Sequence, residues 1–169
     1  MEEAKKDPKF FEPLYKKYYE RILRFVYKRM ESLDNTREIT SIVFTKALIS
    51  IKKFEQRGFP FSSWLHRIAI NEIAQFYRNE KKARVICIDT IGINRLADET
   101  GKHNESLSPL LVNAMQQLME DEVLLLELRF FENKAFAEIG EILGITENNA
   151  KVKTYRVLDR LREIFNKLN

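Results

Sequence analysis

Apolar residues recur at the three- and four-residue spacing of an α-helix along most of this 169-residue chain. Long stripes of this kind precede residue 80, and shorter ones resume after Ser108. The whole chain has only five glycines and four prolines, too few for the many tight turns of a β-sandwich. An amphipathic helix buries its apolar stripe against other helices. The spacing therefore predicts an all-α fold.

Helix signals divide the first half of the chain into predicted helices. The first stripe predicts a helix over residues 8–31, with Pro8 in its first turn. A second helix is expected to begin near Asp34 and Asn35, which both suit a cap, and Glu38 follows three residues after Asn35 as in a capping box. It ends before a loop that contains Gly58 and Pro60, since both residues break helices. Ser62 or Ser63 is expected to cap the third helix.

The helical pattern fails between about Val85 and Leu107, where glycine, serine, asparagine and aspartate are frequent. Ser108 followed by Pro109 then forms a helix-start signal. We therefore predict two small helical domains. Residues 1–85 form a three- to four-helix domain, residues 86–107 a flexible linker, and residues 108–169 a domain of about four shorter helices that contains a helix–turn–helix.

Positive charge is concentrated in two places. Residues 1–85 contain 19 Lys and Arg against 11 Asp and Glu. After an acidic stretch over residues 118–147, a second basic segment spans residues 149–162, with Asp159 as its single acid. Two basic patches on two domains indicate two contacts with a polyanion such as nucleic acid. Ordinary solvated helix faces are the simpler explanation for either patch alone.

The residue types needed for catalysis or metal binding are scarce. Cys87 is the only cysteine, there are two histidines, and every glycine is isolated, so no zinc cage or phosphate-binding loop is expected. We predict no catalytic residue, no metal site and no cofactor. Since no apolar run approaches the roughly 20 residues of a membrane span, we expect a cytoplasmic chain without membrane insertion.

The strongest local motif is a predicted helix–turn–helix over residues 136–156. Gly140 is small where the second helix must approach closely, Gly144 suits the positive φ of a helix end, and Thr146 suits the cap of the next helix. In such motifs the second helix enters the DNA major groove. Donor side chains for base edges and phosphates follow on that helix: Asn149, Lys151, Lys153, Tyr155 and Arg156. A plain helical hairpin with a glycine cap would have the same pattern.

A second motif combines aromatic and cationic residues around the third predicted helix. Aromatic rings stack on unpaired bases, and cations neutralise phosphates, so this mixture suits single-stranded nucleic acid. Trp64 and Phe76 are expected in the core instead. The other members are Arg57, Phe59, Phe61, Arg67, Asn71, Tyr77, Arg78, Lys81 and Lys82.

Three segments together resemble the sigma-70 family of bacterial transcription initiation factors, and more narrowly its extracytoplasmic-function (ECF) group. Residues 38–44 are similar to the family's core-binding helix, residues 61–71 to its promoter-melting helix, and residues 136–156 to its C-terminal helix–turn–helix. Their order and spacing also match. Some positions differ: Ser41 and Ile42 stand where the family usually has Gln and Glu, and Ile70 and Gln75 where Arg and Asp are frequent.

The resemblance implies a role for each segment. The first domain would bind the β′ coiled coil of core RNA polymerase through Glu38, Thr40, Phe44 and Lys46. It would also capture unstacked non-template bases of the −10 element. The residues implied there are Arg57, Phe61, Ser62, Arg67, Asn71, Tyr77 and Arg78. The second domain would read the −35 element of promoter DNA with the donor residues of the helix–turn–helix and with Val152. It would also touch the polymerase β flap. An inhibitory anti-sigma factor is a further implied partner.

Two other classes of protein remain open from the sequence. A helix–turn–helix regulator that binds promoters without polymerase would bind duplex DNA tightly on its own, usually as a dimer. A helical adaptor that binds only proteins would have no salt-dependent affinity for DNA.

Overall fold

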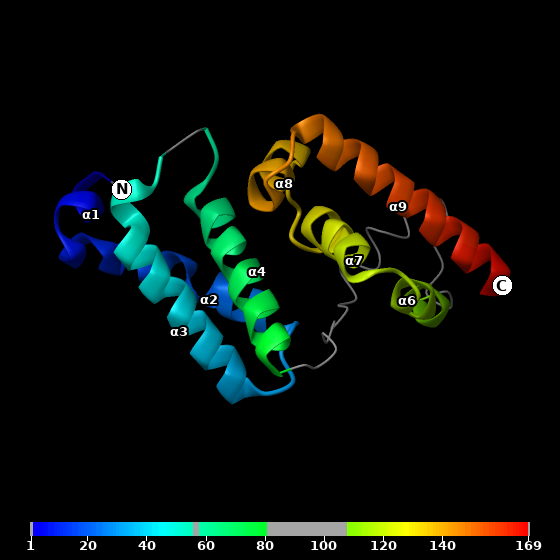
Figure 1. The fold of residues 1–169 in the computed structure, drawn as a ribbon, viewed down its shortest axis with the longest axis horizontal. Coiled ribbons are helices and arrows are strands. Elements are labelled where there is room, and N and C mark those ends of the chain that lie inside the picture. The colour runs from blue at the N-terminus through cyan, green and yellow to red at the C-terminus, as the bar shows by residue number, and fades with distance from the viewer. Residues whose placement is uncertain (1, 56–57, 81–107, 169) are drawn as a thin grey trace. The chain divides into compact units, whose positions relative to one another are not determined.

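The structure, a computed structural model, describes residues 2–55, 58–80 and 108–168. These residues form two compact units: unit 1 contains the described residues up to 80, and unit 2 contains those from 108 onward (Figure 1). Every regular element among them is helical, which confirms the predicted all-α class. The predicted linker, residues 86–107, lies outside the described residues. Within the described parts of the chain, no helix has the length and apolar character required to cross a lipid bilayer.

Unit 1 contains three long helices preceded by short ones. Helices α3 and α4 run antiparallel and pack closely, and α2 packs against both (Figure 1). Their shared core includes Ile22, Phe25, Val43, Leu65 and Ile73, which are completely buried. The elements are α1 (Glu2–Lys6), the 3₁₀ turn η1 (Pro8–Phe11), α2 (Glu12–Tyr27), α3 (Leu33–Ser50), the 3₁₀ turn η2 (Ile51–Lys53) and α4 (Phe61–Glu80).

The helix predicted over residues 8–31 corresponds to α2, which begins later and ends earlier than predicted. Pro13 lies in the first turn of α2, where its missing N–H is tolerated. An α-helix that continued back to Pro8 would place Pro13 in its interior, where its ring would clash with the carbonyl group of Lys9. The preceding residues instead form η1, capped by the Asp7 carboxylate, which accepts a hydrogen bond from the Lys9 N–H at 2.9 Å. Helix α1 has no apolar stripe and was not predicted.

The predicted caps of the next two helices are also wrong. Ser32, and neither Asp34 nor Asn35, caps α3, because the Ser32 hydroxyl oxygen accepts a hydrogen bond from the Asn35 N–H at 3.1 Å. Helix α4 already begins at Phe61, so Ser62 and Ser63 lie buried in its first turn and not at the position that precedes the helix. Pro60, which directly precedes α4, accepts the Ser63 N–H on its carbonyl oxygen instead.

The last helix of unit 2, α9, is the one against which the other helices pack. Helices α6, α7 and α8 all pack against α9. The most deeply buried side chains include Met115, Leu126, Ile139, Leu158 and Leu161. The elements are α6 (Ser108–Gln116), α7 (Glu120–Leu126), the π-helical turn η4 (Glu127–Phe131), α8 (Phe136–Leu143) and α9 (Glu147–Leu168).

The turn between α8 and α9 has the predicted geometry. Gly144 has a φ of 70° and ends α8, and the Ile145 N–H donates to the Gly140 carbonyl oxygen at 2.9 Å. The Thr146 hydroxyl oxygen accepts a hydrogen bond from the Asn149 N–H at 3.2 Å and so caps α9. Gly140 is close-packed as expected, but mainly against the turn: a Cβ atom there would lie 2.7 Å from the Ile145 carbonyl oxygen.

We predict that Gly144→Ala destabilises unit 2 by about 1–2 kcal/mol, because a Cβ atom disfavours the left-handed conformation. Gly144→Asn is the matched control and is expected to cost less, since Asn tolerates this conformation. Urea unfolding of the full chain by circular dichroism should reveal the loss. Trp64, the only tryptophan, lies in unit 1, so its fluorescence transition should stay unchanged. An Ala variant as stable as the parent would contradict this prediction.

Candidate nucleic-acid and polymerase interfaces

The predicted −35 residues lie together on one exposed face of α9. Residues 150, 154, 157 and 158 face the core, and this leaves the opposite side of the first turns open to solvent. Val152 and Tyr155 are exposed apolar and aromatic side chains on that side. All six predicted residues are exposed: Asn149, Lys151, Val152, Lys153, Tyr155 and Arg156. A face with these donors can enter a major groove.

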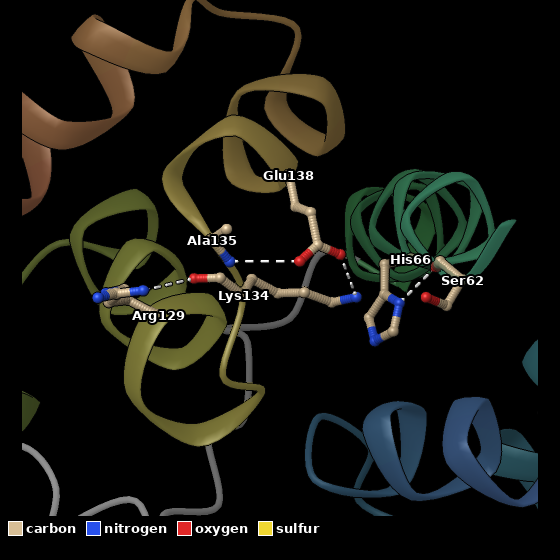
Figure 2. Close-up of polar contacts among 6 residues, drawn as sticks. All are labelled: Ser62, His66, Arg129, Lys134, Ala135 and Glu138. Atoms are coloured by element: carbon tan, nitrogen blue, oxygen red, sulfur yellow. Dashed lines mark hydrogen bonds and ion pairs between the residues drawn. The ribbon is translucent and has the colours of Figure 1, made fainter. Parts of the chain in front are cut away.

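Contacts from η4 and α8 hold this face in position. The Tyr155 ring lies 6.0 Å from the Phe136 ring, and the Arg129 guanidinium lies 4.6 Å from the Phe136 ring. Arg129 also donates to the Lys134 carbonyl oxygen at 3.0 Å, and the Glu138 carboxylate contacts Lys134 Nζ at 3.0 Å (Figure 2). Sequence analysis missed Arg129 because no helical spacing links it to Tyr155.

The basic segment predicted over residues 149–162 has a shorter stretch of net positive charge in the structure, because two of its cations pair with carboxylates. Arg160 donates to Glu122 on α7 at 2.8 Å, and Arg162 donates to Asp159 at 2.9 Å. These two cations are neutralised by carboxylates, and Asp159 and Glu163 follow the open face along the helix. The cationic part of that face is therefore limited to the first turns of α9.

Three of the predicted −10 residues lie on one stripe of α4. Arg67, Asn71 and Arg78 are exposed, and their spacing of four and seven residues places them on the same side of the helix. This stripe presents two cations and an amide, which suits contact with a nucleic-acid strand. Arg57 lies outside the described residues.

The other predicted −10 residues are parts of the core of unit 1. Phe61 and Ser62 are buried in the first turn of α4, and the Ser62 carbonyl oxygen lies 2.6 Å from Nδ1 of His66 (Figure 2). Tyr77 is buried, and its hydroxyl donates to the Arg29 carbonyl oxygen at 2.7 Å. In this structure none of the three presents its side chain to solvent for a base, so their contribution is to hold α4.

A pocket of about 410 Å³ lies beside the exposed stripe, between α3 and α4. Trp64 and Ile68 give it apolar surface, and Asn71 gives it an amide. Lys46 reaches the pocket from α3 and forms an ion pair with Glu72 of α4 at 2.7 Å. Ser50 completes the lining. The structure thus brings Lys46, predicted to bind polymerase, next to the predicted −10 residue Asn71.

The remaining predicted polymerase residues divide into exposed and buried ones. Glu38 is exposed, whereas Thr40 is buried and donates to the Thr36 carbonyl oxygen at 2.7 Å. Phe44 is buried against Tyr15, with 4.8 Å between the ring centres. Thr40 and Phe44 therefore shape α3 from within. Glu38 shares the outer face of α3 with residues that sequence analysis did not select: Ser41, Ile42, Thr45 and Ile49.

The outer face of α3 presents one strongly exposed apolar side chain among polar residues. Ile49 is 75% exposed. Beside it, an apolar groove of about 310 Å³ runs between α3 and the start of α2, lined by residues that include Phe11, Tyr15 and Leu48. Partial burial raises the pKa of Tyr15, and the neighbouring Tyr19 adds to this shift. Tyr15 therefore adds no charge to the groove at neutral pH. Ile49 lies outside the apolar stripe that α3 buries in the core. An apolar residue at such a position is the sequence signal for this exposed face.

Comparison with known proteins identifies the two units. The family model for sigma-70 region 2 matches residues 14–83, and that for sigma-70 region 4 matches residues 114–163. The chain belongs to the sigma-70 family. Region 2 therefore covers α2, α3 and α4, and region 4 covers the helix–turn–helix.

Curated relatives place the chain in the ECF group of that family. ECF RNA polymerase sigma factor BldN of Streptomyces coelicolor is 25% identical over 91% of this chain, which spans 60% of BldN. RNA polymerase sigma factor SigV of Bacillus subtilis is 28% identical over 82% of this chain and 81% of SigV. ECF RNA polymerase sigma factor SigM of the same species is 23% identical over 91% and 94%. A solved RsbN–BldN complex matches 95% of this chain and 94% of its own, with 22% identity and a TM-score of 0.42.

We predict that Tyr77→Phe destabilises unit 1 by about 1 kcal/mol, because it removes the hydrogen bond to the Arg29 carbonyl group. Urea unfolding followed by Trp64 fluorescence measures this loss. Tyr27→Phe is the matched control, since Tyr27 is 56% exposed, and it should leave the midpoint unchanged. Equal midpoints for Tyr77→Phe and the parent chain would mean that the hydroxyl does not anchor α4.

Proposed function

We propose that this chain binds core RNA polymerase and directs it to promoters that carry −35 and −10 elements. The observation that carries this proposal is the presence of region 2 and region 4 in order on one chain. The matching relatives are named RNA polymerase sigma factors. The chain has no chemical step of its own in this role and needs no cofactor, because polymerase makes the RNA.

Unit 2 would read the −35 element through the first turns of α9. Lys151, Lys153 and Arg156 are long donors that reach guanine edges or phosphates, and Val152 offers an apolar contact to a thymine methyl group. The exposure of this face supports the assignment. The acids that follow it, Asp159 and Glu163, would limit contact with DNA to the N-terminal part of the helix.

Unit 1 would hold the non-template strand of the −10 element along α4. Arg67 and Arg78 would contact phosphates, and Asn71 would face an unstacked base. The neighbouring pocket supports this role because Trp64 offers an aromatic surface on which a base can stack. Phe61, Ser62 and Tyr77 would act indirectly, by fixing the position of the helix.

Polymerase would dock on the outer face of α3. Its apolar residues and the adjacent groove suit a helical partner, and the β′ coiled coil is the partner that we assign to it. Unit 2 would also touch the β flap. We further propose that the protein acts in the cytoplasm, and that an anti-sigma factor inhibits it by covering one of these surfaces.

Run-off transcription tests the proposed function. Core RNA polymerase from the same host is mixed with a genomic promoter library, with and without this chain. We expect specific transcripts only when the chain is present. Specific binding of the free chain to palindromic duplex DNA, without any effect on polymerase, would instead support a polymerase-independent regulator.

The two DNA-contacting helices should differ in their mutant phenotypes. Arg156→Ala should weaken closed-complex binding by about 1–3 kcal/mol and relax base preference at one −35 position. Asn71→Ala should leave closed-complex binding nearly intact and impair strand opening, since its partner base is exposed only after unstacking. A duplex binding assay and permanganate footprinting of the −10 region measure the two effects.

Matched controls separate these effects from a general loss of charge or polarity. Arg162→Ala removes a cation from the same helix, but one that is paired with the exposed Asp159. Asn79→Ala removes an exposed amide near the end of α4. Both should behave like the parent chain in both assays. If Arg156→Ala and Asn71→Ala give the same defect, the two helices do not have separate roles.

A further inference from the structure

The pocket between α3 and α4 contains one feature that the proposed function does not explain. A carboxylate, Glu72, lines a site that would receive a strand of negatively charged nucleic acid. Only 13% of the Glu72 side chain is exposed, against 54% for its partner Lys46. A carboxylate in this position repels phosphates and has lost part of its hydration, so it is unfavourable unless something compensates for it.

Lys46 supplies part of that compensation. The Nζ atom of Lys46, on α3, lies 2.7 Å from a carboxylate oxygen of Glu72, on α4, so this contact joins the two helices. The ion pair removes the net negative charge and fixes the orientation of the carboxylate. A carboxylate has two oxygens and about four lone-pair positions, so Glu72 keeps acceptor capacity beyond this one contact.

The neighbours of Glu72 in the pocket suit a nucleobase. Trp64 and Ile68 offer apolar surface for stacking, and Asn71 lies one residue before Glu72 on the same helix. An ionised carboxylate accepts hydrogen bonds but cannot donate them. It therefore pairs with an exocyclic amino group, as in the contact between Glu and the N4 amino group of cytosine. Adenine, cytosine and guanine carry such a group. An unpaired thymine offers a carboxylate only its N3–H, which lies between two carbonyl oxygens that repel the carboxylate.

We propose that Glu72 is a specificity-determining residue that selects, at one position of the −10 element, an unstacked base with an exocyclic amino group over thymine. Lys46 is its positioning residue. This inference rests on the proposed function, because it takes the pocket as the place where region 2 holds a non-template base. The alternative is that the ion pair only fastens α3 to α4.

The experiment uses polymerase reconstituted with the full-length chain and promoter templates with a randomised −10 region. Transcripts are sequenced to obtain the base preference at each non-template position. The parent chain should disfavour thymine at one position by at least about tenfold, the range of one good base contact. Glu72→Gln should reduce this discrimination to about twofold or less, because the amide can donate to the thymine O4 atom.

A charge swap distinguishes base selection from simple fastening of the helices. The double variant Lys46→Glu with Glu72→Lys can restore the ion pair and should keep the melting temperature of the parent chain. It should nevertheless lose the discrimination against thymine, since a lysine at position 72 only donates. Asp34→Asn, which removes an exposed acid paired with Arg37 at 3.9 Å, is the control and should keep the parent's preferences.

Unchanged base preferences in Glu72→Gln, or a swapped variant that keeps the parent's preferences, would overturn the assignment of Glu72. Either result would leave the proposed function intact, because the parent chain would still direct transcription. If the parent chain directs no specific transcription at all, the proposed function fails and this inference fails with it.

Discussion

The exposed residues of the proposed −10 site depend on one buried ring, that of Phe61. Its centre lies 5.3 Å from the rings of Phe54 and Trp64, 5.5 Å from that of Tyr18 and 6.5 Å from that of Phe11. These partners come from η1, from α2, from the chain after η2 and from α4 itself. Aromatic pairs of this kind each contribute about 0.5–1.5 kcal/mol beyond area burial. Because Phe61 begins α4, the cluster determines where that helix starts and which later residues face outward.

The opposite end of α4 is held by a different kind of contact. Tyr77 reaches back to the carbonyl group of Arg29, just after α2, and the Lys46–Glu72 ion pair joins α4 to α3 between the two ends. A binding site needs its side chains on rigid elements. Helix α4 meets this requirement because it is anchored near both ends and along its middle. Its exposed stripe can then meet a flexible single strand without first becoming ordered, which reduces the entropic cost of binding.

Much of this fold follows from helical spacing alone, because each long helix buries one continuous stripe. The turn around Gly144 was also predictable, since a positive φ and a threonine cap leave clear sequence signals. The misses have local causes. Pro13 limits the start of α2, and Ser32 competes successfully with Asn35 for the cap of α3. The short α1 lacks a periodic signal from which it could be inferred, and helical spacing does not distinguish the π-helical turn η4 from a continued α-helix.

The candidate site was less predictable, because residue type does not reveal burial. Phe61 and Tyr77 fit an aromatic nucleic-acid motif in the sequence, yet packing places both inside unit 1. Helical spacing alone does separate Arg67, Asn71 and Arg78 from them, since these three share one stripe. No local pattern joins Lys46 to Glu72, which are 26 residues apart on different helices. Only the antiparallel packing of α3 on α4 brings them together. This packing places the Glu72 carboxylate, which only accepts hydrogen bonds, beside the Trp64 ring, where the sequence had indicated cations and aromatic rings.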